Sequence, residues 1–199
     1  MLNDDRLSRA LSLAHEAHRT QKRKGTEIPY ISHPMAVAAL TLEHGGNENQ
    51  AIAALLHDVI EDGGADYTAR IEEAFGSDVL VMVQDCTDGT AESKAVALTP
   101  AQKYIDWKTR KQTYLKHLRD KPLATPSLLV SACDKLHNAR AILSDFRQLG
   151  APLFDRFTAG RDGTLWYYDA LAILFVDKQV APAAQLHATV KELLVEAAA

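Results

Sequence analysis

The 199-residue sequence has few cysteines and no long hydrophobic run. Two cysteines, Cys86 and Cys133, are too few for a disulfide framework or a four-thiolate zinc site, so we expect both to be reduced and buried. No apolar segment approaches the roughly 20 residues that a membrane-spanning helix needs. The charged N-terminal stretch also differs from a signal peptide. These absences predict a cytoplasmic protein without a membrane partner.

The sequence also has little excess charge of either sign. Its net charge is −4 and its isoelectric point is near 6.0, which argues against a polymeric nucleic-acid partner. Hydrophobic residues make up 47% and charged residues 24%, a balance typical of globular rather than disordered chains. At this length we expect one domain with a sizeable core.

Helical periodicity dominates the sequence, and no segment is typical of a strand. Ser32 is a candidate cap for one helix, and Asn47, with Gln50 three residues later, for the next. The stretch TDGTAESKAVALTP, residues 87–100, is expected to be a loop. The sequence therefore predicts an all-α, single-domain helical bundle over 1–199. We expect its helices at 5–21, 32–44, 47–64, 67–75, 77–86, 100–119, 126–149, 163–178 and 183–198.

The apolar segment AALLHDVIEDGG, residues 53–64, is interrupted by ionisable residues. At about 100° per residue they share one flank of a single continuous helix. A buried carboxylate without a partner is costly, and a bound cation would satisfy this flank. The alternative is the exposed polar edge of an amphipathic helix. The residues concerned are His57, Asp58, Glu61 and Asp62.

Two further segments add residues of the same kind. PYISHP places His33 at a helix start, and SLLVSACDKLHNARAIL places Asp134, His137 and Asn138 on one face of a largely apolar helix. Mixed imidazole and carboxylate ligands favour Mn²⁺, Fe²⁺, Co²⁺ or Zn²⁺ over Ca²⁺ or Mg²⁺. A four-ligand set for such a cation consists of His33, His57, Asp58 and Asp134.

This combination of motifs resembles the HD superfamily of metal-dependent phosphohydrolases. AHRTQKRKGTEIPYISHPMAVA, AALLHDVIEDGG and DKLHNAR are similar to the hydrolase domain of bifunctional alarmone synthetase/hydrolases and to the small alarmone hydrolases. The motifs lie within about 11–147, and C-terminal helices continue to 199. Since the chain ends at Ala199, without room for a synthetase domain, we expect a stand-alone hydrolase.

The resemblance implies an activity and residues that carry it. Hydrolases of this family use Mn²⁺ to remove the 3′-pyrophosphate of (p)ppGpp, which gives GDP or GTP and pyrophosphate. Glu61 and Asp62 match the acidic pair beside the metal, so we expect them to be catalytic and not ligands. The expected substrate is thus a small nucleotide, and the expected metal ligands are His33, His57, Asp58 and Asp134.

The resemblance also implies a set of substrate contacts. Arg23 and Lys24 match the basic pair that lies along the nucleotide, although a solvated basic helix end would have the same composition. The other expected contacts are Tyr30, Leu136 and Asn138.

Two departures from the large alarmone enzymes leave the choice of base open. Ala141 stands where they carry threonine, and an extra residue near Ile28 lengthens the loop after the basic pair. Adenosine alarmones, (p)ppApp, another 3′-phosphorylated nucleotide, or NADPH with its 2′-phosphate are therefore alternative substrates.

The metal-ligand pattern also fits proteins of two different functional classes. An HD-type 5′-nucleotidase or dNTP hydrolase would keep the same metal ligands but would have no use for the basic pair before His33. A regulatory binding module with a degenerate site is disfavoured, because the expected ligands and acidic residues are all present. The sequence does not predict an oligomeric state.

Overall fold

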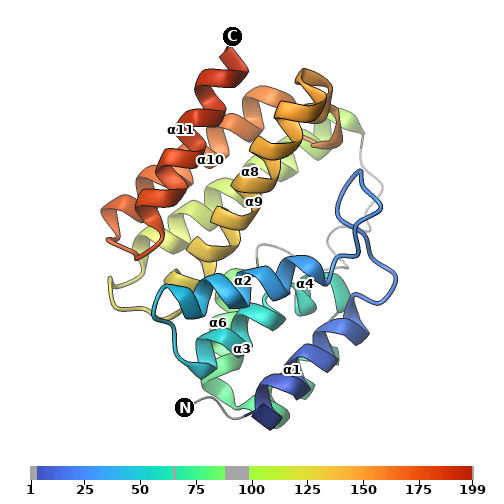
Figure 1. Ribbon diagram of the computed structural model, residues 1–199, viewed down its shortest axis with the longest axis vertical. Coiled ribbons are helices and arrows are strands. Elements are labelled where there is room, and N and C mark those ends of the chain that lie inside the picture. The colour runs from blue at the N-terminus through green and yellow to red at the C-terminus, as the bar shows by residue number, and fades with distance from the viewer. Residues whose placement is uncertain (1–3, 65, 88–98, 199) are drawn as a thin grey trace. The chain divides into compact units, whose positions relative to one another are not determined.

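The structure is a computed structural model that describes residues 4–64, 66–87 and 99–198, apart from the side chains of Asp4 and Asp62 (Figure 1). Within these ranges the chain is helical and contains no strand; an isolated antiparallel bridge joins Lys22 and Pro29. The predicted all-α fold class is confirmed. The loop predicted over 87–100 lies almost entirely outside the described residues.

The described residues form two compact units. Unit 1 holds those up to position 96 together with Leu129–Asp134, and unit 2 holds those from position 97 to Leu128 and from Lys135 onward. Helix α9, Ser127–Leu149, contributes residues to both units. The other helices of unit 1 are α1 (Asp4–Ala17), α2 (Ser32–Glu43), α3 (Glu48–Leu56), α4 (Val59–Gly63), α5 (Asp66–Phe75) and α6 (Ser77–Cys86).

Helix α3 is the core of unit 1. It packs against α1, α2 and α6, and its residues from Ala51 to Leu56 are all buried. Asn47 caps it as predicted, because the Asn47 side chain accepts from the Gln50 N–H while the Gln50 side chain accepts from the Asn47 N–H. The two bonds satisfy backbone donors that the first helical turn leaves without partners.

The predicted cap of the preceding helix is wrong. The residue before α2 is Ile31, which has helical dihedral angles (φ −54°, ψ −25°) and makes no side-chain capping bond. The Ser32 hydroxyl donates instead to the Pro29 carbonyl at 2.8 Å. The chain therefore enters α2 from a tight turn that continues into the helix, and no hydroxyl is needed at its start.

The helix predicted over 47–64 is also divided. Helix α3 ends at Leu56 and α4 begins at Val59, with Asp58 between them at φ −100° and ψ −4°. The His57 Nδ1 donates to the Ala54 carbonyl at 2.7 Å, and a continuous helix would offer that carbonyl to the Asp58 N–H. A side chain of the site thus competes with the helical hydrogen bond and turns the chain at His57 and Asp58.

Unit 2 is organised around helix α10, which packs against α8, η1 and α11. The short 3₁₀ helix η1 was not predicted, and α10 begins three residues before the predicted position 163. None of the helices in the described part of the chain combines the length and apolar character needed to span a bilayer. The elements are α8 (Pro100–Asp120), η1 (Ala151–Arg156), α10 (Gly160–Asp177) and α11 (Ala183–Ala198).

Candidate metal centre

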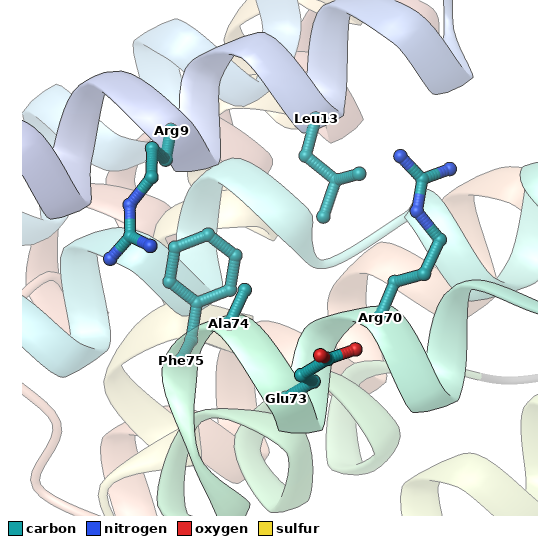
Figure 2. Close-up of a pocket in the computed structure, with 6 residues that line it drawn as sticks. All are labelled: Arg9, Leu13, Arg70, Glu73, Ala74 and Phe75. Atoms are coloured by element: carbon teal, nitrogen blue, oxygen red, sulfur yellow. The ribbon is translucent and has the colours of Figure 1, made fainter.

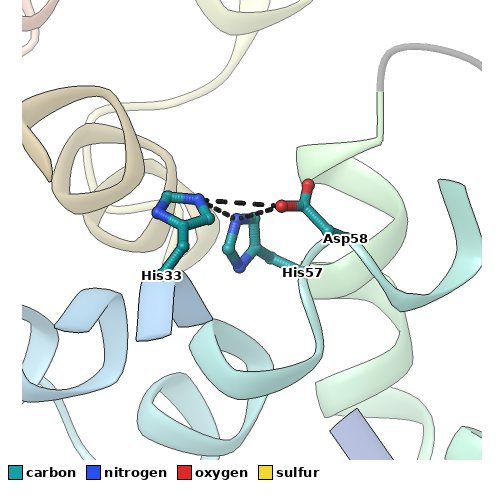
Figure 3. Close-up of side chains that lie close together, drawn as sticks. All are labelled: His33, His57 and Asp58. Atoms are coloured by element: carbon teal, nitrogen blue, oxygen red, sulfur yellow. Dashed lines mark hydrogen bonds and ion pairs between the residues drawn. The ribbon is translucent and has the colours of Figure 1, made fainter. Parts of the chain in front are cut away.

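Three of the predicted metal ligands meet inside unit 1 (Figure 3). His33 lies in the first turn of α2, and His57 and Asp58 lie at the turn between α3 and α4. The Nε2 atoms of the two histidines are 3.2 Å apart. The Asp58 Oδ2 lies 3.0 Å from the His57 Nε2 and 3.7 Å from the His33 Nε2. All three donor atoms are within 4.8 Å of one another, a spacing suited to binding one cation.

The fourth predicted ligand comes from a helix 76 positions further along the chain than Asp58. Asp134 belongs to the segment of α9 assigned to unit 1, and its Oδ1 lies 3.1 Å from the His33 Nε2 and 3.7 Å from the His57 Nε2. The fold therefore brings together His33, His57, Asp58 and Asp134, which we call the four-residue cluster.

The chemistry of the four-residue cluster fits a divalent cation. The Ala54 carbonyl can only accept, so the His57 Nδ1 carries the hydrogen of that bond and the lone pair of the neutral ring is on Nε2, which faces the cluster. The Tyr30 hydroxyl donates to the Asp58 Oδ2 at 2.5 Å. His57 and Asp58 are thus each oriented by a partner outside the cluster, as is usual for metal ligands. Two imidazoles and two carboxylates are a donor set for a borderline transition metal.

Burial and charge act in opposite directions on the histidines, each of which is 1% exposed. Burial lowers the pKa of His33. Burial also opposes a charge on His57, but the Asp58 and Asp134 carboxylates raise the pKa of His57 well above its usual value. Desolvation would raise the pKa of Asp58, but the His57 imidazolium holds it well below the usual range. The two carboxylates therefore favour the protonated form of His57, and a divalent cation would compete with that proton.

The two predicted catalytic residues, Glu61 and Asp62, follow Asp58 closely in the sequence. Glu61 lies half-buried in α4, close in sequence to His57 and Asp58. The side chain of Asp62 is outside the part that the structure describes. The predicted roles of both residues stay predictions.

The predicted substrate contacts lie on two segments. The half-buried Arg23 has its guanidinium carbon 5.6 Å from the centre of the Tyr30 ring, and Lys24 beside it is exposed. Leu136 and Asn138 follow Asp134 in α9 but belong to unit 2, where Leu136 is fully buried and Asn138 is half-buried. Arg23 and Tyr30 are thus neighbours, whereas a substrate contact through any of the five residues stays a prediction.

His18 is a further buried histidine of unit 1. This side chain is only 3% exposed, and its Nδ1 lies 2.7 Å from the Gln21 Oε1. Its ring centre is 4.8 Å from that of Tyr30. Among the described residues, no hydrogen-bond partner lies at the His18 Nε2. In the sequence AHRTQ, the spacing of three positions between His18 and Gln21 is the feature that could have indicated the contact between these two side chains.

A separate pocket of about 410 Å³ lies between α1 and α5 (Figure 2). Its two arginines are already paired, since Arg70 contacts Glu16 at 2.7 Å and Arg9 contacts Asp5 at 3.1 Å. The lining residues include none of the predicted site residues: they are Arg9, Leu13, Arg70, Glu73, Ala74 and Phe75.

Comparisons with known families and proteins show what this chain is similar to. A family model described as an HD domain matches residues 10–165. The guanosine-3′,5′-bis(diphosphate) 3′-pyrophosphohydrolase MESH1 of Xenopus tropicalis is 34% identical over 134 residues, which are 66% of this chain and 66% of that protein. The bifunctional (p)ppGpp synthase/hydrolase SpoT of Escherichia coli (strain K12) is 33% identical over 141 residues, 69% of this chain and 18% of SpoT. The chain thus spans less than two thirds of the length of either relative.

A solved structure has the same fold. It is that of a metazoan ortholog of SpoT that hydrolyzes ppGpp and plays a role in starvation responses. It superposes with a TM-score of 0.72 at 22% identity and covers 96% of this chain and 97% of that one. At this identity the likeness establishes the fold alone.

Proposed function

This chain belongs to the HD-domain family, and from that premise we propose that it hydrolyses the 3′-pyrophosphate of alarmone nucleotides, (p)ppGpp and (p)ppApp. The observation that carries the proposal is the four-residue cluster, in which two imidazole nitrogens and two carboxylate oxygens lie 3.0–3.7 Å from their neighbours. The similarity to the 3′-pyrophosphohydrolase of Xenopus tropicalis supports this substrate class.

We assign a divalent cation, Mn²⁺, to His33, His57, Asp58 and Asp134. When bound there, it supplies the positive charge that polarises a phosphoryl oxygen and lowers the pKa of a water molecule. The imidazole and carboxylate ligands support a transition metal over Ca²⁺ or Mg²⁺.

The two acidic residues that follow Asp58 in the sequence act on the attacking water and its proton. Glu61 and Asp62 accept that proton or orient the water, roles that suit carboxylates. Water attacks the phosphorus atom attached to the 3′-oxygen, the bond between them breaks, and the 3′-oxygen takes up a proton. The products are pyrophosphate and the nucleoside 5′-diphosphate or 5′-triphosphate.

The basic segment before His33 holds the nucleotide. The Arg23 guanidinium stacks on the base, and Lys24 contacts a phosphate. The other substrate contacts that we propose from the resemblance are Tyr30, Leu136 and Asn138. The small nucleotide is the partner of this site, and we propose neither a polymeric nucleic acid nor a membrane as a second one. The buried thiols of Cys86 and Cys133 support a cytoplasmic location.

The proposal is tested by identifying the products. With ppGpp or ppApp and Mn²⁺ we expect the nucleoside 5′-diphosphate and intact pyrophosphate, because the bond to the 3′-oxygen is the one that breaks. Anion-exchange chromatography combined with a pyrophosphate assay measures both products. GTP and dATP at the same concentration should stay intact, since neither has a 3′-phosphate to place at the cluster.

The matched control is His57→Ala, which removes one proposed ligand and should abolish product formation. Release of orthophosphate from the 5′ side, or of triphosphate from a dNTP, would overturn the proposal. Those products would support the HD-type 5′-nucleotidase or dNTP hydrolase instead. NADPH, whose ribose phosphate is on the 2′-oxygen, belongs in the same panel, because its loss of phosphate without alarmone turnover would identify a different nucleotide substrate.

A further inference from the structure

We propose that Tyr30 is a positioning residue that holds Asp58 in place and thereby sets the affinity of the four-residue cluster for a divalent cation. Tyr30 was expected to contact substrate, but its hydroxyl donates to the Asp58 Oδ2 at 2.5 Å. This inference rests on the proposed metal centre and is independent of which nucleotide is hydrolysed.

The hydroxyl binds the oxygen atom that matters for the cluster. The Asp58 Oδ2 is the same atom that lies 3.0 Å from the His57 Nε2 and 3.7 Å from the His33 Nε2 (Figure 3). A hydrogen bond to this atom fixes the rotamer of Asp58 so that Oδ2 faces both imidazoles. Without the hydroxyl, the half-buried carboxylate can rotate away from the imidazoles, and a cation must then restrain it on binding.

Tyr30 is itself held from several sides. Its N–H donates to the Gln21 carbonyl at 2.9 Å, and its carbonyl accepts from the His33 N–H at 2.9 Å. Its ring contacts those of two histidines, with centres 4.8 Å from His18 and 5.7 Å from His33. The His18 ring is fixed in turn by the contact of its Nδ1 with the Gln21 Oε1 at 2.7 Å. The phenol is therefore held in position, as a residue that orients a metal ligand must be.

The same tyrosine contacts the basic segment. The Arg23 guanidinium carbon lies 5.6 Å from the centre of the Tyr30 ring, within the range of a cation–π contact. One side of Tyr30 thus faces the residue proposed to stack on the base, and its hydroxyl contacts a proposed metal ligand. This placement explains how one aromatic residue orients Asp58 while lying beside the nucleotide site.

The test compares Mn²⁺ binding by wild type and Tyr30→Phe, which removes the hydroxyl but keeps the ring. Isothermal titration calorimetry gives the dissociation constant, and we expect it to rise about tenfold or more, the usual cost of losing a partner of a metal ligand. The matched control is Tyr67→Phe in the same unit, whose hydroxyl donates to the Glu16 carboxylate at 3.4 Å, away from the cluster. The control should bind Mn²⁺ as wild type does.

The outcomes separate this inference from the proposed function. A Tyr30→Phe dissociation constant within twofold of wild type overturns the role of Tyr30 while leaving the metal centre intact. Failure of the wild type itself to bind Mn²⁺ overturns the metal centre and this role with it. Binding with the expected loss, but without alarmone hydrolysis by the wild type, supports the role of Tyr30 and overturns only the substrate.

A second measurement on the wild type applies if Tyr30→Phe fails to fold. The chain has six tyrosines, so the ring-carbon resonance of Tyr30 in ¹³C-tyrosine-labelled protein can be assigned by elimination with Tyr→Phe variants of the other five. One equivalent of Zn²⁺, a diamagnetic probe, should shift the Tyr30 resonance at the carbon that bears the hydroxyl and leave that of Tyr67 unchanged. A Tyr30 resonance that does not respond to bound Zn²⁺ overturns the inference.

Discussion

At the scale of single residues, the site is a compromise between burial and charge. His33 and His57 are each 1% exposed, and their Nε2 atoms lie 3.2 Å apart, so two protonated rings would repel one another strongly. The Asp58 and Asp134 carboxylates offset the desolvation of one proton on His57. A cation with two positive charges would neutralise both carboxylates and leave both rings neutral. The cluster is thus better suited to a divalent cation than to a proton.

Substitutions at Glu61 and at a ligand should have different effects. Glu61→Gln should retain Mn²⁺ but lose turnover by about 10²-fold or more, because it removes only a proton acceptor. Asp134→Ala should lose Mn²⁺ and turnover together, because it removes a carboxylate that lies 3.1 Å from the His33 Nε2. Metal content after gel filtration and the steady-state rate measure the two effects. Loss of metal from Glu61→Gln would show that Glu61 is a ligand.

At the scale of elements, the ends of helices position the site. Helix α2 carries His33 in its first turn, and the break between α3 and α4 carries His57 and Asp58. Helix α3 is buried against α1, α2 and α6, so the turn at its C-terminal end is fixed by the packing of the whole helix. Two of the metal ligands, His57 and Asp58, are therefore positioned by a rigid helix although they lie just beyond its C-terminal end.

Asn47 and Ser32, which the sequence predicts as the caps of two helices in unit 1, should respond differently to substitution by alanine. Asn47→Ala should lower the free energy of unfolding by about 1 kcal/mol, because it removes the capping box of α3. Ser32→Ala should cost less, because the Ser32 hydroxyl donates to the Pro29 carbonyl and caps no helix. Urea unfolding monitored by circular dichroism compares the two variants. An equal loss in both would contradict the assignment of the N-terminus of α2.

At the scale of the whole molecule, the HD-domain match over residues 10–165 includes parts of both compact units. The proposed metal ligands all belong to unit 1, because α9 contributes Leu129–Asp134 to it. The predicted contacts Leu136 and Asn138 belong to unit 2. A ligand that binds only the folded chain stabilises it by an amount that grows with the logarithm of the ratio of ligand concentration to dissociation constant.

Removing the metal should therefore lower the melting temperature by an amount that depends on pH. The pKa of His57 is raised in the folded chain, so the proton on His57 stabilises the metal-free fold below the unfolded value of about 6.5, and this stabilisation is lost as pH rises through the raised pKa. Mn²⁺ must displace that proton, so it binds more tightly as pH rises. Because the metal and the proton compete for His57, the difference between Mn²⁺-loaded and EDTA-treated protein widens as pH rises from about 6.5 to about 8.

Differential scanning fluorimetry at several pH values measures this difference, and at about 100 times the dissociation constant the metal contributes about 2.7 kcal/mol. His57→Ala is the control, since it removes both the proton site and a ligand and should show no Mn²⁺-dependent change. A difference that shrinks as pH rises would contradict a protonated His57 in the metal-free cluster.

The sequence by itself determined the helices and the kinds of residue that form the site. Helical periodicity and caps such as Asn47 with Gln50 act over a few residues, and ionisable residues such as His57 and Asp134 stand out in apolar segments without any knowledge of the fold. Only the tertiary structure decided how these parts are joined. The break at His57, the bond from Tyr30 to Asp58 and the burial of His18 against Tyr30 each depend on side chains brought together by folding. Their energies come from burial and contact geometry, which no local pattern in the sequence records.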